Sequence, residues 1–191
     1  MNIWLITVSI LALIVGAVLH NIMMKQGFKS NKAVSFILSV FIAFGLTLRF
    51  GMSVYALQGL FLYFLLLYAS ISDITSRTIQ NSVSVSILAL SLVSIQSIGI
   101  ISMIAGALIV CLVQLIVCLC NSGRHGGADM KITTASAFLL GFGRGITGLV
   151  LGLLIGIVFM LIYNKMKKRN NKEGFPLMPF VSIGMMTLFF V

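Results

Sequence analysis

The chain has two aspartates, Asp73 and Asp129, and each lies where a long apolar run meets a polar, basic loop. Glu173 is the one other acidic residue in the 191 residues of the chain. An ionised side chain at membrane depth is costly, so an acid kept there usually serves a function. Two carboxyls that meet at the end of a helix bundle cannot both ionise cheaply, and one of them holds a proton. An aspartic protease uses such a pair: the carboxylate activates water, and the neutral acid polarises the scissile carbonyl. A proton-coupled transporter could use the same pair as a relay.

The residues around each aspartate suit a functional site. A short polar loop follows Asp73 and leads to Asn81, which is a favourable N-cap for the next helix. Gly126 and Gly127 precede the second aspartate and allow close backbone approach. That aspartate begins a helix, where the helix dipole favours its anionic form, and the charge of Lys131 two residues later is expected to do the same.

Other candidate catalysts are weaker. No Ser–His or Cys–His pairing is evident, and we interpret His20 and His125 as solvated or locally bonded side chains. A contact between His125 and the acid site is the lesser alternative. The three cysteines lie in one apolar run without a C-x-x-C pair, which predicts buried thiols rather than metal ligands. We therefore expect no metal and no cofactor. The cysteines are Cys111, Cys118 and Cys120.

The composition predicts a polytopic membrane protein. The chain is 60% hydrophobic and 8% charged, whereas a soluble domain is about 25% charged. Eight apolar runs of near-spanning length cover the sequence, which predicts an all-α bundle of about eight transmembrane helices. The expected spans are residues 3–19, 33–48, 53–72, 82–97, 100–120, 130–142, 146–163 and 177–191.

The positive charges are distributed unevenly between the two sides of this bundle. Eleven lysines and arginines fall on one side, and only Arg49 and Arg144 fall on the other. The positive-inside rule places the rich side in the cytoplasm together with both aspartates, and it places both termini outside. This placement explains the net charge of +10 without a nucleic-acid partner. The rich side holds Lys25, Lys29, Lys32, Arg77, Arg124, Lys131, Lys165, Lys167, Lys168, Arg169 and Lys172.

A ladder of small residues marks the seventh span. Gly148, Gly152 and Gly156 repeat every four residues, a spacing that lets two membrane helices approach closely. We expect packing within the chain, with a dimer interface or a hinge as alternatives. The sequence defines no oligomeric state.

Three short motifs lie in order on the predicted cytoplasmic side. They are Asp73 with Ile79 and Asn81 six and eight residues later, the segment Gly126–Lys131, and the segment Phe175–Phe180 with Pro176 and Pro179. In order and spacing they resemble the aspartate motif, the G-x-G-D-x-K segment and the late P-x-x-P-[FY] element of the type IV prepilin peptidase family. Presenilin-like proteases share the G-x-G-D element, but the other two motifs fit prepilin peptidases better.

The resemblance implies a membrane-embedded aspartic endopeptidase in the bacterial cytoplasmic membrane. Such an enzyme removes the short basic leader of a type IV prepilin or pseudopilin at the cytoplasmic face, before the apolar helix of the substrate. It implies a peptidase core over residues 53–191, preceded by a helix pair over residues 1–52. The matching aspartates would be the catalytic pair. The residues that would support them are Gly126, Gly127, Lys131, Asn81, Pro176 and Pro179.

The chain departs from the family pattern at three places. Gln80 stands where the family usually has Pro, and Ala128 replaces the second glycine of G-x-G-D, which disfavours a positive φ there. The loop at residues 20–32 is short and lacks the paired C-x-x-C zinc motifs of many relatives. We therefore expect a short-form member without zinc, and we do not extend N-methyltransferase activity to it.

Overall fold

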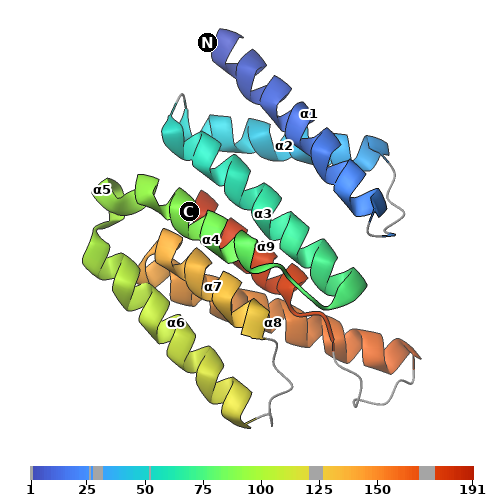
Figure 1. Cartoon of the computed structure of the whole chain (residues 1–191), viewed down its shortest axis with the longest axis vertical. Helices are drawn as coiled ribbons and strands as arrows, with labels where there is room; N and C mark the ends of the chain where they lie inside the picture. The colour runs from blue at the N-terminus through green and yellow to red at the C-terminus, as the bar shows by residue number, and fades with distance from the viewer. Residues whose placement is uncertain (1, 26, 28–31, 52, 121–126, 168–174) are drawn as a thin grey trace.

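The computed structural model describes residues 2–25, 27, 32–51, 53–120, 127–167 and 175–191. Within these residues all regular structure is helical, which confirms the predicted all-α bundle (Figure 1). The helices are α1 (Asn2–Lys25), α2 (Lys32–Phe50), α3 (Val54–Ser76), α4 (Asn81–Ser91), the 3₁₀ turn η1 (Leu92–Ser94), α5 (Ile95–Ile98), α6 (Ile100–Cys120), α7 (Gly127–Leu140), α8 (Phe142–Lys167) and α9 (Met178–Phe190).

Five helical segments in the described part of the chain are long and apolar enough to cross a membrane. They are Ile6–Lys25, Val54–Ser76, Asn81–Ile98, Ile100–Leu119 and Phe142–Met166. Two shorter apolar helices, Ile37–Phe50 and Met178–Phe190, accompany them. The observed helices follow the eight predicted runs in order. The third helix runs four residues beyond the predicted end at residue 72, so Asp73 lies inside its last turn and not in a loop.

The fourth predicted span is interrupted. The chain passes from α4 through the 3₁₀ turn η1 into α5, instead of forming one continuous helix. Gln58 of α3 lies buried against this interruption, where its Nε2 donates to Leu90 O at 3.0 Å and to Ser94 Oγ at 2.7 Å. Polar side chains that bond a neighbouring helix stabilise such irregular backbone within a membrane bundle.

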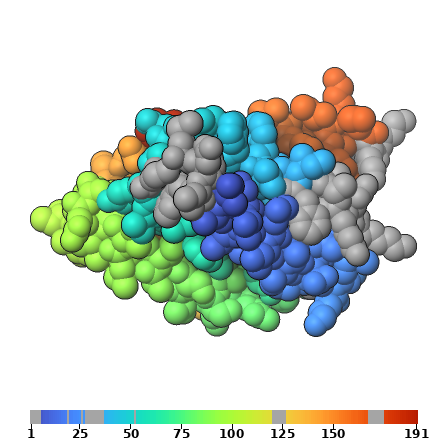
Figure 2. All heavy atoms as spheres, turned by 90° about the horizontal axis from the view of Figure 1, so that it is seen from above, coloured from blue at the N-terminus to red at the C-terminus, as the bar shows by residue number. Residues whose placement is uncertain are grey.

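Helices α3 and α9 lie at the centre of the bundle (Figure 1). Helices α1 and α2 pack on one side of α3, and α4, α6, α7 and α8 lie on the other side of the central pair. From above, α1 and α2 cover part of α3, while the end of α8 extends beyond them (Figure 2). The central pair therefore contacts both halves of the molecule.

The glycine ladder of α8 packs against α9. A Cβ added at Gly152 would lie 2.7 Å from Val181 Cα, and one at Gly148 would lie 3.0 Å from Met185 Sδ. On the facing helix, a Cβ at Gly184 would collide with the backbone of both ladder glycines. The expected packing role within the chain is confirmed at these positions.

The two ends of α9 carry opposite kinds of partner. At its C-terminal end, Arg49 donates to Phe190 O at 2.9 Å and to Val191 O at 3.2 Å, and Arg144 donates to Val191 O at 3.4 Å. At its N-terminal end, Met178 donates to the carboxylate of Asp73. The two arginines thus lie at the opposite end of the bundle from this aspartate.

Candidate active site

Asp73 is held by the start of α9. Its side chain is buried, with 7% of its surface exposed. Its Oδ2 accepts a hydrogen bond from the backbone N–H of Met178, the first residue of α9, at 3.1 Å. The first N–H groups of a helix lack partners within the helix and carry its positive partial charge. The start of α9 therefore offers a binding site for the anionic form of this carboxyl.

The turn after Asp73 is fixed by short hydrogen bonds. Ser72 Oγ donates to Thr78 O at 2.6 Å, and Ser76 Oγ donates to the same carbonyl at 3.2 Å. Arg77 ends α3 in the left-handed conformation, with φ 53°. Its guanidinium also interacts electrostatically with the Asp73 carboxylate. These hydrogen bonds and the left-handed conformation of Arg77 thus define the turn that follows Asp73.

Asp129 lies in the first turn of α7, outside the five long apolar segments, and is half-buried. Burial, and then the negative charge of Asp73, raise the pKa of Asp129 to about 7. The net change in this pKa therefore runs opposite to the anionic form that the helix start and Lys131 were expected to favour, and desolvation is its largest cause. The effect of Asp73 on this pKa means that the two acids interact, although they are separated by 55 residues of sequence.

Lys131 has a different partner from the one expected. Its Nζ donates to Asn81 Oδ1 at 3.0 Å, which joins the first turn of α7 to the start of α4. Asn81 is the first residue of α4 and not its N-cap, since Gln80 occupies that position. The predicted capping role of Asn81 is therefore wrong. Its side chain instead links the first aspartate motif to the second.

The late proline motif opens α9 as predicted. Pro179 lies in the first turn, where a missing N–H costs least, and Pro176 precedes the helix and is half-buried. An aromatic cluster holds this segment against α8. The ring of Phe175 lies 5.4 Å from that of Phe180, 5.9 Å from that of Phe159 and 6.4 Å from that of Tyr163, between centroids. The cluster fixes the approach of the chain to the N–H group that binds Asp73.

Other predicted residues play a smaller part in the observed geometry. Gly127 is the first residue of α7, and a Cβ there would meet nothing within 4 Å among the described residues. Gly126 and His125 lie outside the described residues. His20 is buried within α1, which excludes the solvated alternative and leaves the locally bonded one. In the described part of the chain, no group of three or more His, Cys, Asp or Glu side chains could hold a metal ion.

Comparison with known proteins identifies the class of this bundle. Residues 60–163, more than half of the chain, match the model of the type IV leader peptidase family. The chain belongs to this family. It is a peptidase and a multi-pass membrane protein, and the matched region includes both Asp73 and Asp129. Neither a curated protein nor a solved structure matches the chain significantly.

Proposed function

We propose that the protein is an aspartic endopeptidase that removes the short basic leader from type IV prepilins or pseudopilins. Asp73 and Asp129 form its catalytic pair. The observation that carries this proposal is the hydrogen bond from Met178 N–H to Asp73 Oδ2. Burial and the negative charge of Asp73 raise the pKa of the second acid, Asp129. This arrangement gives two chemically similar carboxyls different environments, which is how such pairs divide the roles of base and acid.

In this mechanism Asp73 acts as the carboxylate and Asp129 as the neutral acid. Both carboxyls lose water on burial, but Asp73 accepts a backbone N–H from Met178 and interacts with the Arg77 guanidinium, and these two contacts favour its charged form. Burial and the neighbouring charge favour the protonated form of Asp129 at pH values below about 7, the value to which its pKa is raised. The pair titrates as a unit, so a single shared proton is the working state.

The reaction requires no group beyond this pair and one water molecule. Asp73 takes a proton from water as the water oxygen attacks the scissile carbonyl carbon, while Asp129 gives its proton to the carbonyl oxygen. When the tetrahedral intermediate collapses, the C–N bond breaks and Asp73 passes its proton to the amine nitrogen. Asp129 recovers a proton from a hydroxyl of the intermediate, so both acids return to their initial states.

We also propose that the acid end of the bundle faces the cytoplasm. Arg77, Lys131 and Lys165 lie at or near this end, whereas Arg49 and Arg144 bind the opposite end of α9. The positive-inside rule favours the basic end in the cytoplasm, with both termini on the outer side of the bacterial inner membrane. Alkaline phosphatase fused after residue 191 is then active, because it folds only outside the cytoplasm. An inactive fusion in an accumulated protein would reverse the orientation.

The test of the catalytic pair uses charge-removing substitutions. Asp73→Asn and Asp129→Asn are each expected to lower cleavage of a co-expressed prepilin by at least about a hundredfold, because each removes one partner of the proton exchange. Leader removal is followed by the change in substrate mass. Glu173→Gln is the matched control, since it removes the one remaining acid of the chain, and it should leave cleavage unchanged. Normal cleavage by either aspartate variant would refute the assignment.

A further inference from the structure

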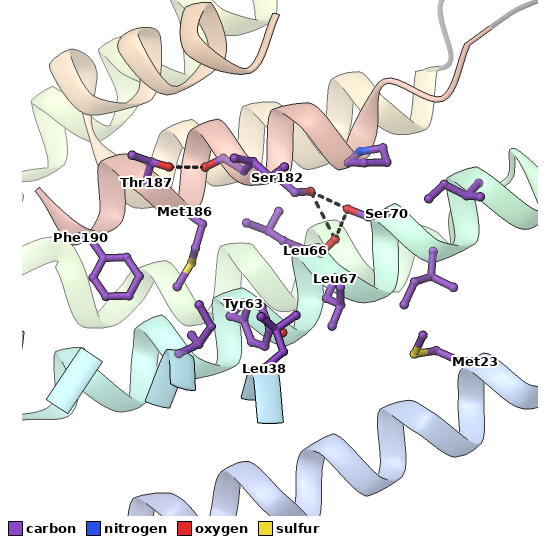
Figure 3. A pocket seen from close by; sticks show the side chains of 15 residues that line it. Met23, Leu38, Tyr63, Leu66, Leu67, Ser70, Ser182, Met186, Thr187 and Phe190 are labelled. Atoms are coloured by element: carbon purple, nitrogen blue, oxygen red, sulfur yellow. Dashed lines mark hydrogen bonds between the residues drawn. The ribbon is translucent and has the colours of Figure 1, made fainter. Parts of the chain in front are cut away.

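Two serines that line a mostly apolar groove join the central helices α3 and α9 (Figure 3). Ser70 Oγ lies 2.9 Å from Ser182 Oγ, and these two oxygens lie 2.7 Å and 3.3 Å from Leu66 O, respectively. Both serine side chains are buried. Each hydroxyl has one proton to donate, and in every arrangement of the two protons at least one hydrogen bond joins Ser182 of α9 to α3.

The hydrogen bonding of Ser182 differs from that of other hydroxyls in the bundle. Thr187, further along α9, donates to Ile183 O at 2.8 Å, which is a bond within one helix (Figure 3). Ser91 of α4 likewise donates to Leu88 O of its own helix. Such bonds satisfy a hydroxyl without involving a neighbouring helix. Ser182 instead bonds groups of α3, so it contributes to the fit between two helices.

The serine pair lies one helical turn from the contact that holds the first aspartate. Ser70 precedes Asp73 by three residues on α3, and Ser182 follows Met178 by four residues on α9. These spacings correspond to rises of about 4.5 Å and about 6 Å along the two helices. Residues three or four apart share a helix face. The serine pair and the bond from Met178 N–H to Asp73 Oδ2 therefore lie along the same face of the α3–α9 interface.

The bond from Met178 to Asp73 is sensitive to the position of α9 along α3. Its length is 3.1 Å, close to the usual upper limit of about 3.2 Å for an N–H···O bond. A small slide of α9 would therefore break it. Apolar contacts are not directional, whereas a hydrogen bond weakens steeply with distance and angle. The glycine ladder fixes α9 against α8, but Asp73 lies on α3, so the fit between α3 and α9 determines this contact.

Building on the proposed function, we propose that Ser70 and Ser182 are positioning residues for the catalytic pair. Their hydrogen bonds set the position of α9 along α3 and thereby keep the Met178 N–H on the Asp73 carboxylate. Neither serine takes part in the proton exchange. Loss of the serine pair lets α9 move and lengthens the bond that favours the charged form of Asp73. The effect falls on the proton transfer and not on the binding of substrate.

Alanine substitutions test this role without leaving a hydroxyl unpaired. In Ser182→Ala, Ser70 still donates to Leu66 O, and the pair no longer joins the two helices. In Ser70→Ala, Ser182 still has Leu66 O as a partner, so one longer bond between the helices remains. Both variants should therefore fold, and Ser182→Ala should have the larger effect. The double variant should match Ser182→Ala, because groups in one hydrogen-bond network act together.

Steady-state kinetics of prepilin cleavage measures the effect. Ser182→Ala should lower kcat about tenfold and change KM less than about twofold, because a small displacement at the reacting carboxyl slows the chemical step. Ser70→Ala should lower kcat only about threefold, because one bond between the helices remains. Ser91→Ala is the matched control, since it removes a hydroxyl from another buried serine that bonds within its own helix, and it should retain the parental kcat and KM. A parental kcat in Ser182→Ala, or a loss confined to KM, would overturn the assignment.

Nuclear magnetic resonance tests the contact directly and needs no substrate. An amide proton that bonds a carboxylate resonates downfield, so the Met178 amide reports its bond to Asp73. In protein labelled with ¹⁵N-methionine, Met178→Leu identifies this signal by its disappearance, and Asp73→Asn gives its position without the carboxylate. In Ser182→Ala the signal should move toward that position, and in Ser91→Ala it should stay at the parental one. An unmoved signal in Ser182→Ala would refute the positioning role.

The two measurements separate the serine pair from the chemistry. If the parent protein cleaves no prepilin, the proposed function fails, and the Met178 signal still decides whether the serines hold the contact with Asp73. If the parent cleaves prepilin and Ser182→Ala retains the parental kcat, only the assignment of the serine pair fails.

Discussion

Charged side chains bind the backbone at both ends of α9, but they differ in sign and in burial. At the C-terminal end, exposed guanidinium groups of Arg49 and Arg144 bind the last carbonyls. At the N-terminal end, a buried carboxylate on Asp73 binds the first N–H. Both contacts place a charge at the end of the helix dipole that carries the opposite partial charge, which is favourable. Only the N-terminal contact is buried and interacts with a second acid, Asp129, and we attribute the proposed chemistry of that end to this difference.

The largest difference between the two ends should be seen in the pH dependence of cleavage. Asp129 has a pKa raised to about 7, so its protonated fraction falls as the pH rises through that value. If its proton is used in the reaction, kcat/KM should fall about tenfold per pH unit above 7, or about a hundredfold by pH 9. A pH profile of prepilin cleavage between pH 5 and 9 measures this fall. Arg49→Ala should keep the same profile, and a flat profile up to pH 9 would contradict the role of Asp129.

The same ionisation should affect stability. The pKa of Asp129 is higher in the folded protein than in an unfolded chain, so the folded state binds more protons between about pH 4 and pH 7. Stability therefore decreases as the pH rises through this window and levels off above it. Thermal unfolding in detergent should show a higher Tm at pH 5.5 than at pH 8.5. The Asp129→Asn variant should show a smaller difference, and an equal difference would exclude this linkage.

The next effect concerns the helix that connects the two ends. Gly184→Ala places a methyl group against the backbone of α8, so α9 must shift. Such overpacking costs about 1–3 kcal/mol, or about 2–4 °C of Tm for each kcal/mol. Cleavage should fall as well, because the shift displaces the N–H that binds Asp73. Gly143→Ala is the control, since a Cβ there meets nothing within 4 Å among the described residues, and its Tm should match that of the parent.

The smallest effect is expected at the cationic end. Arg49→Ala removes two hydrogen bonds to the carbonyls of Phe190 and Val191. Because the guanidinium is exposed, the loss should be at most about 1 kcal/mol. Arg144→Ala should cost less, since it removes one longer bond. Thermal unfolding of both variants measures the order. If either substitution lowered cleavage as strongly as Asp73→Asn, the division of roles between the two ends would be wrong.

Much of the architecture could be predicted from the sequence. Apolar runs gave the order of the helices, and the scarcity of acids drew attention to Asp73 and Asp129. The interruption at Leu92–Ser94 could not be read from hydropathy, which does not reveal its hydrogen bond to Gln58 on a different helix. The available signal was a lone glutamine within an apolar span, since such residues usually bond a neighbouring helix.

The details of the candidate site were harder to predict. Asn81 is a residue type that often caps helices, but its side chain accepts a hydrogen bond from Lys131 of α7 instead. Only the tertiary fold brings these two residues together. The position of Asp129 at a helix start favoured its anionic form. The burial that raises its pKa depends on the tertiary fold, so it could not be predicted from the sequence. An apolar groove lined by α1, α2, α3 and α9 could likewise not be predicted, since it arises between four helices and not within one sequence pattern.

The contact between Met178 and Asp73 also limits what genetics can reveal about this protein. The donor is a main-chain amide, so nineteen of the twenty amino acids at position 178 would retain it. An alanine scan would score this position only for its buried side chain and would pass over the interaction. Only proline, which has no amide hydrogen, would remove it.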